Sequence, residues 1–148
     1  MSKDFIRSEF ASRSENEALA RVIVSAFIAR LDPTLEELDD VRTAVSEAVT
    51  NAIIHGYGHA DGIVYLTAEL IDQTLTLTVE DHGVGIADLT QAMQPLYTSK
   101  PDEERSGMGF TMMQTFMDDL FVSSAPGEGT KVVMIKSCRC LPDAALNL

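Results

Sequence analysis

Several features that would place the chain in another protein class are missing from its 148 residues. No apolar run approaches the roughly 20 residues of a membrane-spanning helix, and the opening residues, Met-Ser-Lys-Asp-Phe-Ile-Arg-Ser-Glu-Phe, contain no apolar secretory core. The two cysteines, Cys138 and Cys140, are too few for a disulfide framework or a full zinc site. We therefore expect a cytosolic protein with free thiols.

Basic residues are also scarce. Eleven Lys and Arg stand against 23 Asp and Glu, which gives a formal net charge of −12. A nucleic-acid surface needs clustered Lys and Arg, so this balance argues against direct nucleic-acid binding. It is compatible with a basic protein partner, although net charge alone more often reflects solubility.

Two common nucleotide-binding signatures are absent. The chain has no Gly-x-x-x-x-Gly-Lys-Ser/Thr sequence, so a P-loop is excluded, and it has no His-Arg-Asp set of the protein-kinase type. Any nucleotide site must therefore be built another way.

The hydrophobic content of 45% is enough for the core of one domain. Helices are expected from Ser12 or Ser14 to about Leu31, with Ser14 and Glu17 at capping-box spacing, and from Thr34 to about Gly56, with a second box at Thr34 and Glu37. Two later helical segments are expected, at 87–93 and 107–120.

Alternating apolar residues predict strands between these helices. The expected strands are 4–10, 63–71, 75–80, 120–124 and 130–137. Residues 72–73 are expected to form the turn of a hairpin. In it, Ile63, Tyr65 and Thr67 of the first strand would face Leu75, Leu77 and Val79 of the second. Residues 94–106 read as a mobile loop, and the tail from 138 to 148 as frayed. The order predicts an α+β two-layer sandwich, with helices on one face of a mixed, mainly antiparallel sheet.

The second helix carries the most informative polar residues. Glu47, Asn51 and His55 recur every four residues, and each step over-rotates a helix by only about 40°, so the three share one flank beside an apolar surface. Buried polar groups need partners or a ligand. A solvated polar stripe is the simpler interpretation of these residues alone.

Three glycine-containing stretches follow in the chain. The first is Asp81-x-Gly83-x-Gly85 after a strand, where the Asp can accept a hydrogen bond from an exocyclic amine and the glycines let a flat ring approach the backbone. The second stretch, 105–110, begins with Arg105 and places glycines at a helix start, which suits phosphates. The third is 127–130. Each stretch alone is more simply interpreted as an ordinary turn or helix entry.

All four stretches together resemble the ATP-binding domain of the GHKL superfamily, which includes gyrase, heat-shock chaperone ATPases, histidine kinases and MutL proteins. The resemblance covers about residues 5–137, so we expect a single ATP-binding domain over residues 1–137. The sequences of 45–56, 98–101 and 104–110 are most similar to the anti-sigma F factor family of spore-forming bacteria. That resemblance weakens at 57–80 and lapses after Lys136.

The resemblance implies roles around the phosphates. Asn51 would give a side-chain oxygen to Mg²⁺, and Glu47 would orient or deprotonate an attacking serine hydroxyl. Gly107 and Gly109 would present N–H groups to phosphates, and Arg105 would neutralise charge on the γ-phosphate.

It also implies an adenine site and a lid. Asp81 would bind the adenine amine with help from Thr130, while Gly83 and Gly85 would let the ring lie against the backbone. The loop 94–106 would be the ATP lid, and further nucleotide-binding positions would be Thr98, Ser99 and Met108. His55 is expected to close the helix end rather than take part in chemistry.

The family implies a partner switch during sporulation. A homodimer with ATP would hold the sigma F factor inactive and would phosphorylate an anti-anti-sigma factor on serine, with Arg21 as a candidate partner contact. The N-terminal strand could pair across the dimer axis. A histidine-kinase catalytic module, an ATP-gated binding protein without phosphotransfer and a clamp ATPase are the alternatives.

Overall fold

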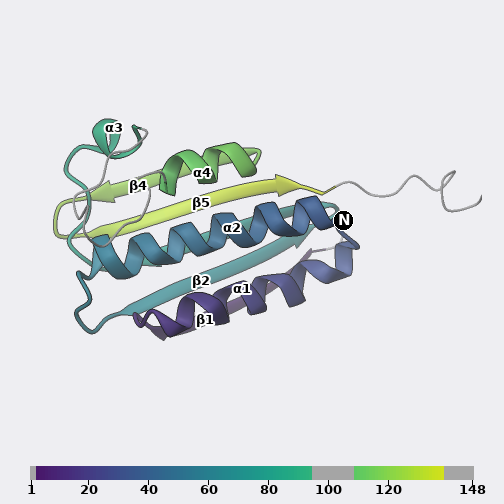
Figure 1. Ribbon diagram of the computed structural model, residues 1–148, viewed down its shortest axis with the longest axis horizontal. Helices are drawn as coiled ribbons and strands as arrows, with labels where there is room; N and C mark the ends of the chain where they lie inside the picture. The colour runs from purple at the N-terminus through teal and green to yellow at the C-terminus, as the bar shows by residue number, and fades with distance from the viewer. Residues whose placement is uncertain (1–2, 95–108, 139–148) are drawn as a thin grey trace, which may run out of the picture.

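The computed structural model describes residues 3–94 and 109–138 (Figure 1). The first half of the chain contains β1 (Lys3–Ala11), α1 (Glu15–Ile28), the 3₁₀ turn η1 (Ala29–Leu31), α2 (Leu35–Asn51) and the π-helical turn η2 (Ala52–Gly56). The second half contains β2 (Ile63–Ile71), β3 (Thr74–Asp81), α3 (Leu89–Ala92), α4 (Gly109–Phe116), β4 (Asp119–Ala125) and β5 (Gly129–Ser137). The predicted order of elements is confirmed.

The five strands form one sheet in the order β1-β2-β3-β5-β4. All four ladders between described strands are antiparallel, so the "mixed" part of the predicted fold class is wrong. Helices α1, α2 and α4 lie along one face of the sheet, with α2 between the other two (Figure 1). The predicted two-layer α+β sandwich is otherwise confirmed, and β1 and β4 are its edges.

The core lies between the sheet and the helices. Leu75, Leu77 and Val79 of β3 point into it as predicted, and each is at most 2% exposed. The predicted facing residues of β2 are wrong by one position, because Leu66 rather than Tyr65 lies opposite Val79. The phase of Val64, Leu66, Ala68 and Leu70 is entirely apolar, whereas the other phase contains Thr67 and Glu69, so the alternation itself favours the observed inner face.

The two predicted capping boxes have opposite outcomes. At the start of α2, the Thr34 hydroxyl oxygen accepts the Glu37 N–H at 3.1 Å, and the Glu37 carboxylate accepts the Thr34 N–H at 2.9 Å. At the start of α1, Ser14 has helical backbone angles and makes no side-chain cap, so the predicted box at Ser14 and Glu17 is wrong. Glu17 instead bonds Arg21 and Ser46, which ties α1 to α2.

Two ends of elements also differ from the prediction. Helix α4 ends at Phe116 rather than near Leu120, because the Asp118 N–H already donates to the Ile135 carbonyl at 2.8 Å as the chain enters β4. Cys138, assigned to the tail, is only 5% exposed, and its N–H donates to the Gln73 carbonyl. Burial raises the pKa of this thiol to about 11, with a contribution from Glu37, so it stays protonated at neutral pH. Residues 139–148, including Cys140, lie outside the described part of the chain.

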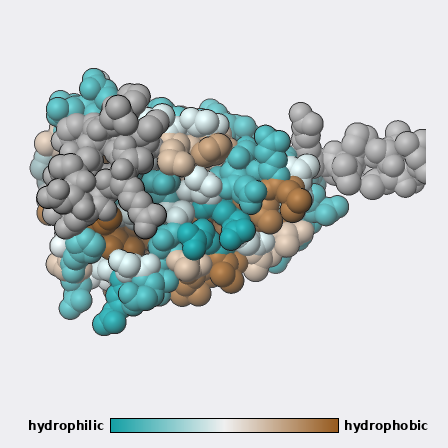
Figure 2. Space-filling view, in the orientation of Figure 1, coloured by the Kyte–Doolittle hydropathy of each residue, from teal (hydrophilic) through white to brown (hydrophobic). Residues whose placement is uncertain are grey.

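The helical face is mainly hydrophilic, with hydrophobic side chains scattered among the polar ones (Figure 2). Among the residues that the structure describes, every helix is too short or too polar for a bilayer crossing.

Candidate functional site

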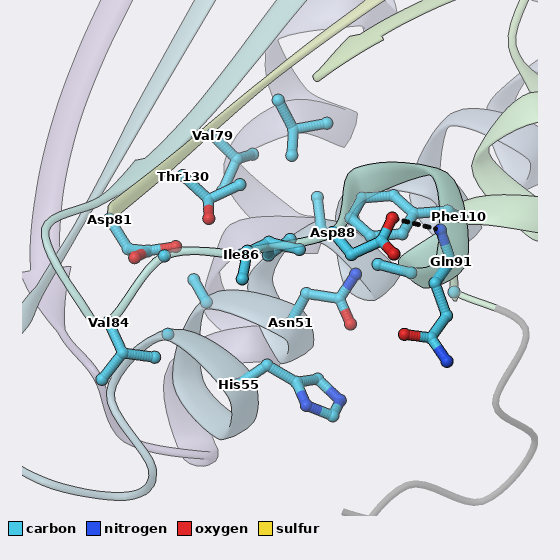
Figure 3. Close-up of a pocket in the computed structure, with 18 residues that line it drawn as sticks. Asn51, His55, Val79, Asp81, Val84, Ile86, Asp88, Gln91, Phe110 and Thr130 are labelled. Atoms are coloured by element: carbon cyan, nitrogen blue, oxygen red, sulfur yellow. Dashed lines mark hydrogen bonds between the residues drawn. The ribbon is translucent and has the colours of Figure 1, made fainter. Parts of the chain in front are cut away.

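A cavity of about 330 Å³ opens where the end of α2, the start of α4, the end of β3 and the start of β5 meet (Figure 3). It brings together residues that the sequence singled out on separate segments: Asn51, His55, Asp81, Gly85, Gly109 and Thr130. Glu47 and Gly83 do not line the cavity, but they lie close to two lining residues, Gly109 and Gly56 respectively. The cavity therefore joins all four sequence motifs.

Asp81 supplies the buried carboxylate of this cavity. It ends β3 and is 4% exposed. Burial raises the pKa of the Asp81 carboxyl, and hydrogen bonds from the Gly83 and Thr130 N–H groups partly oppose that effect. A carboxylate held this way has few ways to move and is costly to keep charged, so a ligand hydrogen-bond donor would relieve it.

Glycines enclose Asp81 so closely that side chains do not fit. A Cβ on Gly129 would lie 2.0 Å from the Asp81 carbonyl oxygen, and a Cβ on Gly56 would lie 2.7 Å from the Asp81 carboxyl. A Cβ on Gly83 would lie 1.9 Å from the Gly56 carbonyl oxygen. The glycines thus let three segments close around one carboxylate.

We expect the crowding at Gly129 to be measurable against a matched control. Gly129 and Gly127 have φ angles of +83° and +78°, but the space around Gly127 is open to 4 Å. Gly127→Ala should cost about 1 kcal/mol of unfolding free energy through backbone strain, and Gly129→Ala clearly more through the added overlap. Urea denaturation of both variants measures the difference, and equal losses would mean that the turn, not the packing on Asp81, requires glycine.

Glu47 and Asn51 meet the first residue of α4. A Cβ built on Gly109 would lie 3.2 Å from Asn51 Nδ2 and 3.4 Å from Glu47 Oε2, so both side chains reach the start of this helix. Asn51 lines the cavity, and Glu47 lies one helical turn earlier on α2. The described residues contain no cluster of three or more His, Cys, Asp or Glu side chains that could hold a metal without a ligand's help.

His55 also lines the cavity, beside Asn51 (Figure 3). It belongs to the π-helical turn, in which the Tyr57 N–H donates to the Ala52 carbonyl at 3.0 Å, five residues back. The predicted helix does end at Gly56, but its last five residues form a π-helical turn instead of continuing with 3.6 residues per turn. The wider turn brings Gly56 against Asp81 and leaves His55 at the cavity instead of merely at a helix end.

A serine that was not predicted to belong to the site organises the adjoining loops. The Ser124 hydroxyl donates to the Gly129 carbonyl at 2.9 Å and accepts the Ile86 N–H at 2.7 Å. It also lies 2.8 Å from Thr130 Oγ1. Since Ser124 has one hydroxyl hydrogen, Thr130 donates in this pair and keeps its lone pairs for other partners. No sequence pattern distinguishes Ser124 from other strand serines.

The other missed residues form the cavity's apolar walls and rim. Asp88 and Gln91 lie at the rim, where the Asp88 carboxylate accepts the Gln91 N–H at 3.0 Å (Figure 3). The apolar lining consists of Ala48, Ala52, Val79, Val84, Ile86, Ala87, Ala92, Phe110 and Val132. Such residues look like ordinary core in a sequence, and only the fold shows that they face a cavity.

Arg21 lies apart from the cavity, on α1. Its guanidinium bonds the Glu17 carboxylate and lies 3.4 Å from the Ser46 hydroxyl, and its side chain is 35% exposed. Arg21 is therefore a partly exposed charge held in one orientation.

Several predicted site residues lie outside the described ranges: Thr98, Ser99, Arg105, Gly107 and Met108, together with most of the expected lid at 94–106.

Comparisons with known proteins agree with this geometry. A family model for the histidine kinase-like ATPase domain matches residues 10–136. The anti-sigma F factor of Clostridium novyi (strain NT) is 57% identical over 142 residues, covering 95% of this chain and 99% of the relative. The anti-sigma F factor of Clostridium beijerinckii is 59% identical over 137 residues, covering 92% and 96%.

The chain belongs to the anti-sigma F factors, within the histidine kinase-like ATPase domain family.

A solved structure supports the fold of this anti-sigma F family member. The RsbU and RsbW domains of a Mycobacterium tuberculosis protein superpose with a TM-score of 0.66 at 17% identity, covering 91% of this chain and 32% of that one. Membership of an ATPase domain family implies that the chain binds ATP or ADP and uses ATP in a kinase-type role. The predicted family and nucleotide class are confirmed.

Proposed function

We propose that the chain inhibits a sporulation sigma factor and, as an ATP-dependent serine kinase, phosphorylates and inactivates the cognate anti-anti-sigma factor. The observation that carries this proposal is one cavity lined by a buried carboxylate, Asp81, and by Asn51, with Glu47 one helical turn before Asn51 and near the same residue, Gly109. The similarity to anti-sigma F factors supports the choice of partners.

Adenine fits the Asp81 side of the cavity. The raised pKa of Asp81 reflects a buried carboxyl whose ionised form would gain from the adenine amine. Thr130 would assist through its hydroxyl lone pairs, and Gly83 and Gly85 would shape the site by letting their turn pack against the carbonyls of Gly56 and Ala125. The apolar lining would exclude water from the two faces of the purine.

The donor set at Glu47 and Asn51 fits Mg²⁺ bound together with phosphates. Mg²⁺ in such sites keeps several waters and takes only one or two protein oxygens, which agrees with a single carboxamide beside a carboxylate. Asn51 would hold the ion, which would neutralise charge on the phosphates. Gly107 and Gly109 would donate N–H groups to the phosphate oxygens at the start of α4.

Glu47 would act on the acceptor. The serine oxygen forms a bond to the γ-phosphorus as the bond from that phosphorus to the bridging oxygen breaks, and ADP leaves with the bridging oxygen. The serine proton would pass to the Glu47 carboxylate. Because the transition state is loose, holding the hydroxyl in line should matter more than proton removal.

The region around the expected lid would complete the site. Arg105 would neutralise the γ-phosphoryl charge in the transition state. Thr98, Ser99 and Met108 would contact the nucleotide. These roles rest on the sequence resemblance, and they allow the lid to differ between ATP and ADP, which partner switching requires.

The exposed face of α1 is our proposed partner surface. Leu19 and Val22, which are three residues apart on α1, are 45% and 64% exposed, and Arg21 lies on the neighbouring flank of the same helix. Exposed apolar side chains near a fixed Arg have the composition of a protein-binding site. We also propose a homodimer that uses the edge strand β1, a single domain over residues 1–137, and a cytoplasmic location with the sigma factor.

Incubation with γ-labelled ATP, Mg²⁺ and the cognate anti-anti-sigma factor tests the function. We expect labelled phosphoserine on that partner and ADP in equal amount. ATP-dependent sigma-factor binding without label on the partner would identify a binding regulator that lacks transfer activity. Label on histidine would identify a histidine kinase-type module instead.

Two variants in the same assay test the assigned arginines. Arg105→Ala should slow transfer by about 10²-fold or more while ADP affinity changes little. Arg21→Ala should weaken partner binding and leave ATP affinity unchanged. A parallel loss of transfer and ADP binding in the first variant, or undiminished partner binding in the second, would remove the role concerned.

A further inference from the structure

Tyr57 makes an unusual connection at the end of the sheet nearest Asp81. Its hydroxyl donates to the Ile63 carbonyl at 2.6 Å and accepts the His82 N–H at 2.7 Å. Both hydrogen-bonding capacities of the phenol are therefore used in pairing β2 with the chain just after β3.

The hydroxyl stands where a ladder hydrogen bond would otherwise form. The β2–β3 ladder begins at the pair Tyr65 and Glu80, and the same register continued by two residues would place Ile63 opposite His82. Tyr57 bridges these two residues instead of letting them bond directly. The strands can thus separate at this end, where Asp81 enters the cavity, without losing the connection between them.

Tyr57 also fixes the turn to the end of α2. It directly follows the π-helical turn, and the preceding residue, Gly56, accepts the Val84 N–H at 2.9 Å. Gly56 and Tyr57 therefore accept hydrogen bonds from the backbone of both neighbours of Gly83, Val84 and His82. Because Gly83 N–H in turn donates to the Asp81 carboxylate at 2.9 Å, these bonds determine where that carboxylate points.

The Tyr57 ring packs closely against Gly62. A Cβ on Gly62 would lie 2.5 Å from ring carbon Cε1, so the glycine allows the ring to lie against the backbone before β2. The position of the hydroxyl is thereby set from both sides, by its hydrogen bonds and by the packing of its ring.

We propose that Tyr57 is a positioning residue that sets the adenine specificity of the pocket by holding the Asp81 turn through its hydroxyl. The inference rests on the proposed nucleotide site and adds a determinant outside the cavity lining. Removing one oxygen leaves His82 N–H without this acceptor and lets the turn relax, so Asp81 should no longer discriminate well between a purine with an amine and one with a carbonyl.

Comparison of ATP with inosine triphosphate tests the role, because the two differ at the group that Asp81 would recognise. We expect wild type to favour ATP by about 10-fold or more, and Tyr57→Phe to reduce that preference to about threefold or less. Tyr65→Phe removes a hydroxyl from the same end of the sheet and should keep the wild-type preference. Gly62→Ala, which displaces the Tyr57 ring while keeping its hydroxyl, should also lower it.

The ratio of ATP affinity to inosine triphosphate affinity distinguishes a positioning role from general destabilisation, because destabilisation would weaken the binding of both nucleotides equally. An unchanged ratio in Tyr57→Phe, or an equal loss in Tyr65→Phe, would overturn the role of Tyr57 while leaving the nucleotide site intact. Failure of wild type to bind ATP would instead contradict the proposed function itself. Should Tyr57→Phe not fold, the ratio in Gly62→Ala decides in the same way.

Discussion

Asp81→Asn should weaken ATP binding by on the order of 100-fold or more and at the same time make the nucleotide-free protein more stable at neutral pH. The affinity falls because an amide group presents a donor as well as an acceptor where the purine amine needs a charged acceptor. Calorimetric titration with ATP measures this effect.

The gain in stability follows from the raised pKa of Asp81. Its ordinary value is 3.8, and burial raises it in the folded state. The folded protein therefore binds the proton more tightly than the unfolded chain, so the free energy of unfolding falls as the pH rises from the unfolded to the folded pKa. Asn has no charge to bury, so its burial carries no such cost. At pH values above the folded pKa of Asp81, the melting temperature of Asp81→Asn should exceed that of wild type by about a few degrees, whereas below the unfolded pKa it should not.

Asp88→Asn is the matched control for Asp81→Asn. It makes the same charge change at the rim of the same cavity, where the side chain is exposed and caps α3. ATP affinity should change less than about threefold, since Asn also caps helices. Similar losses in both variants would mean that net charge near the pocket, not a specific adenine contact, controls binding.

Glu47→Gln should separate nucleotide binding from phosphoryl transfer. The side chain keeps its size beside Asn51 and Gly109 but loses its charge and basicity. We expect ATP affinity within about threefold of wild type and a transfer rate lower by about 10² to 10⁴. Single-turnover phosphorylation of the anti-anti-sigma factor measures the rate, while titration with ADP measures affinity.

Asp39→Asn on the same helix serves as the control for charge alone. Asp39 is exposed near the start of α2 and distant in sequence from the cavity lining. Its substitution should leave the transfer rate unchanged. Equal phosphorylation rates for wild type and Glu47→Gln would remove Glu47 from the mechanism.

The elements were predictable where local chemistry alone decides them. Thr34 and Glu37 cap α2 because the box is a local arrangement, and the hairpin at Asp72 forms with a φ of +53° at that residue, as a tight turn requires. The inner face of β2 was predictable but was assigned to the wrong phase, because Thr67 and Glu69 mark the outer face and the inner residues are all apolar. The π-helical turn was not predictable, because its Gly56 packs against Asp81, which lies 25 residues later in the chain.

The site was predictable as a set of motifs but not as a geometry. Asn51, Asp81, Gly109 and Thr130 were predicted because their four motifs occur together in one order along the chain, although each motif alone is typical of an ordinary turn or helix end. Ser124 and Tyr57 had no such signal. Their importance comes from hydrogen bonds between segments distant in sequence, which no local pattern encodes.

A crystal structure of the protein with ADP and Mg²⁺ tests the central claim most directly, because the claim is a geometry. We predict ADP in the cavity at the end of α2, with the adenine amine within hydrogen-bond distance of the Asp81 carboxylate and the phosphates toward Asn51 and Gly109. A nucleotide bound elsewhere, or an adenine ring turned away from Asp81, would contradict the account.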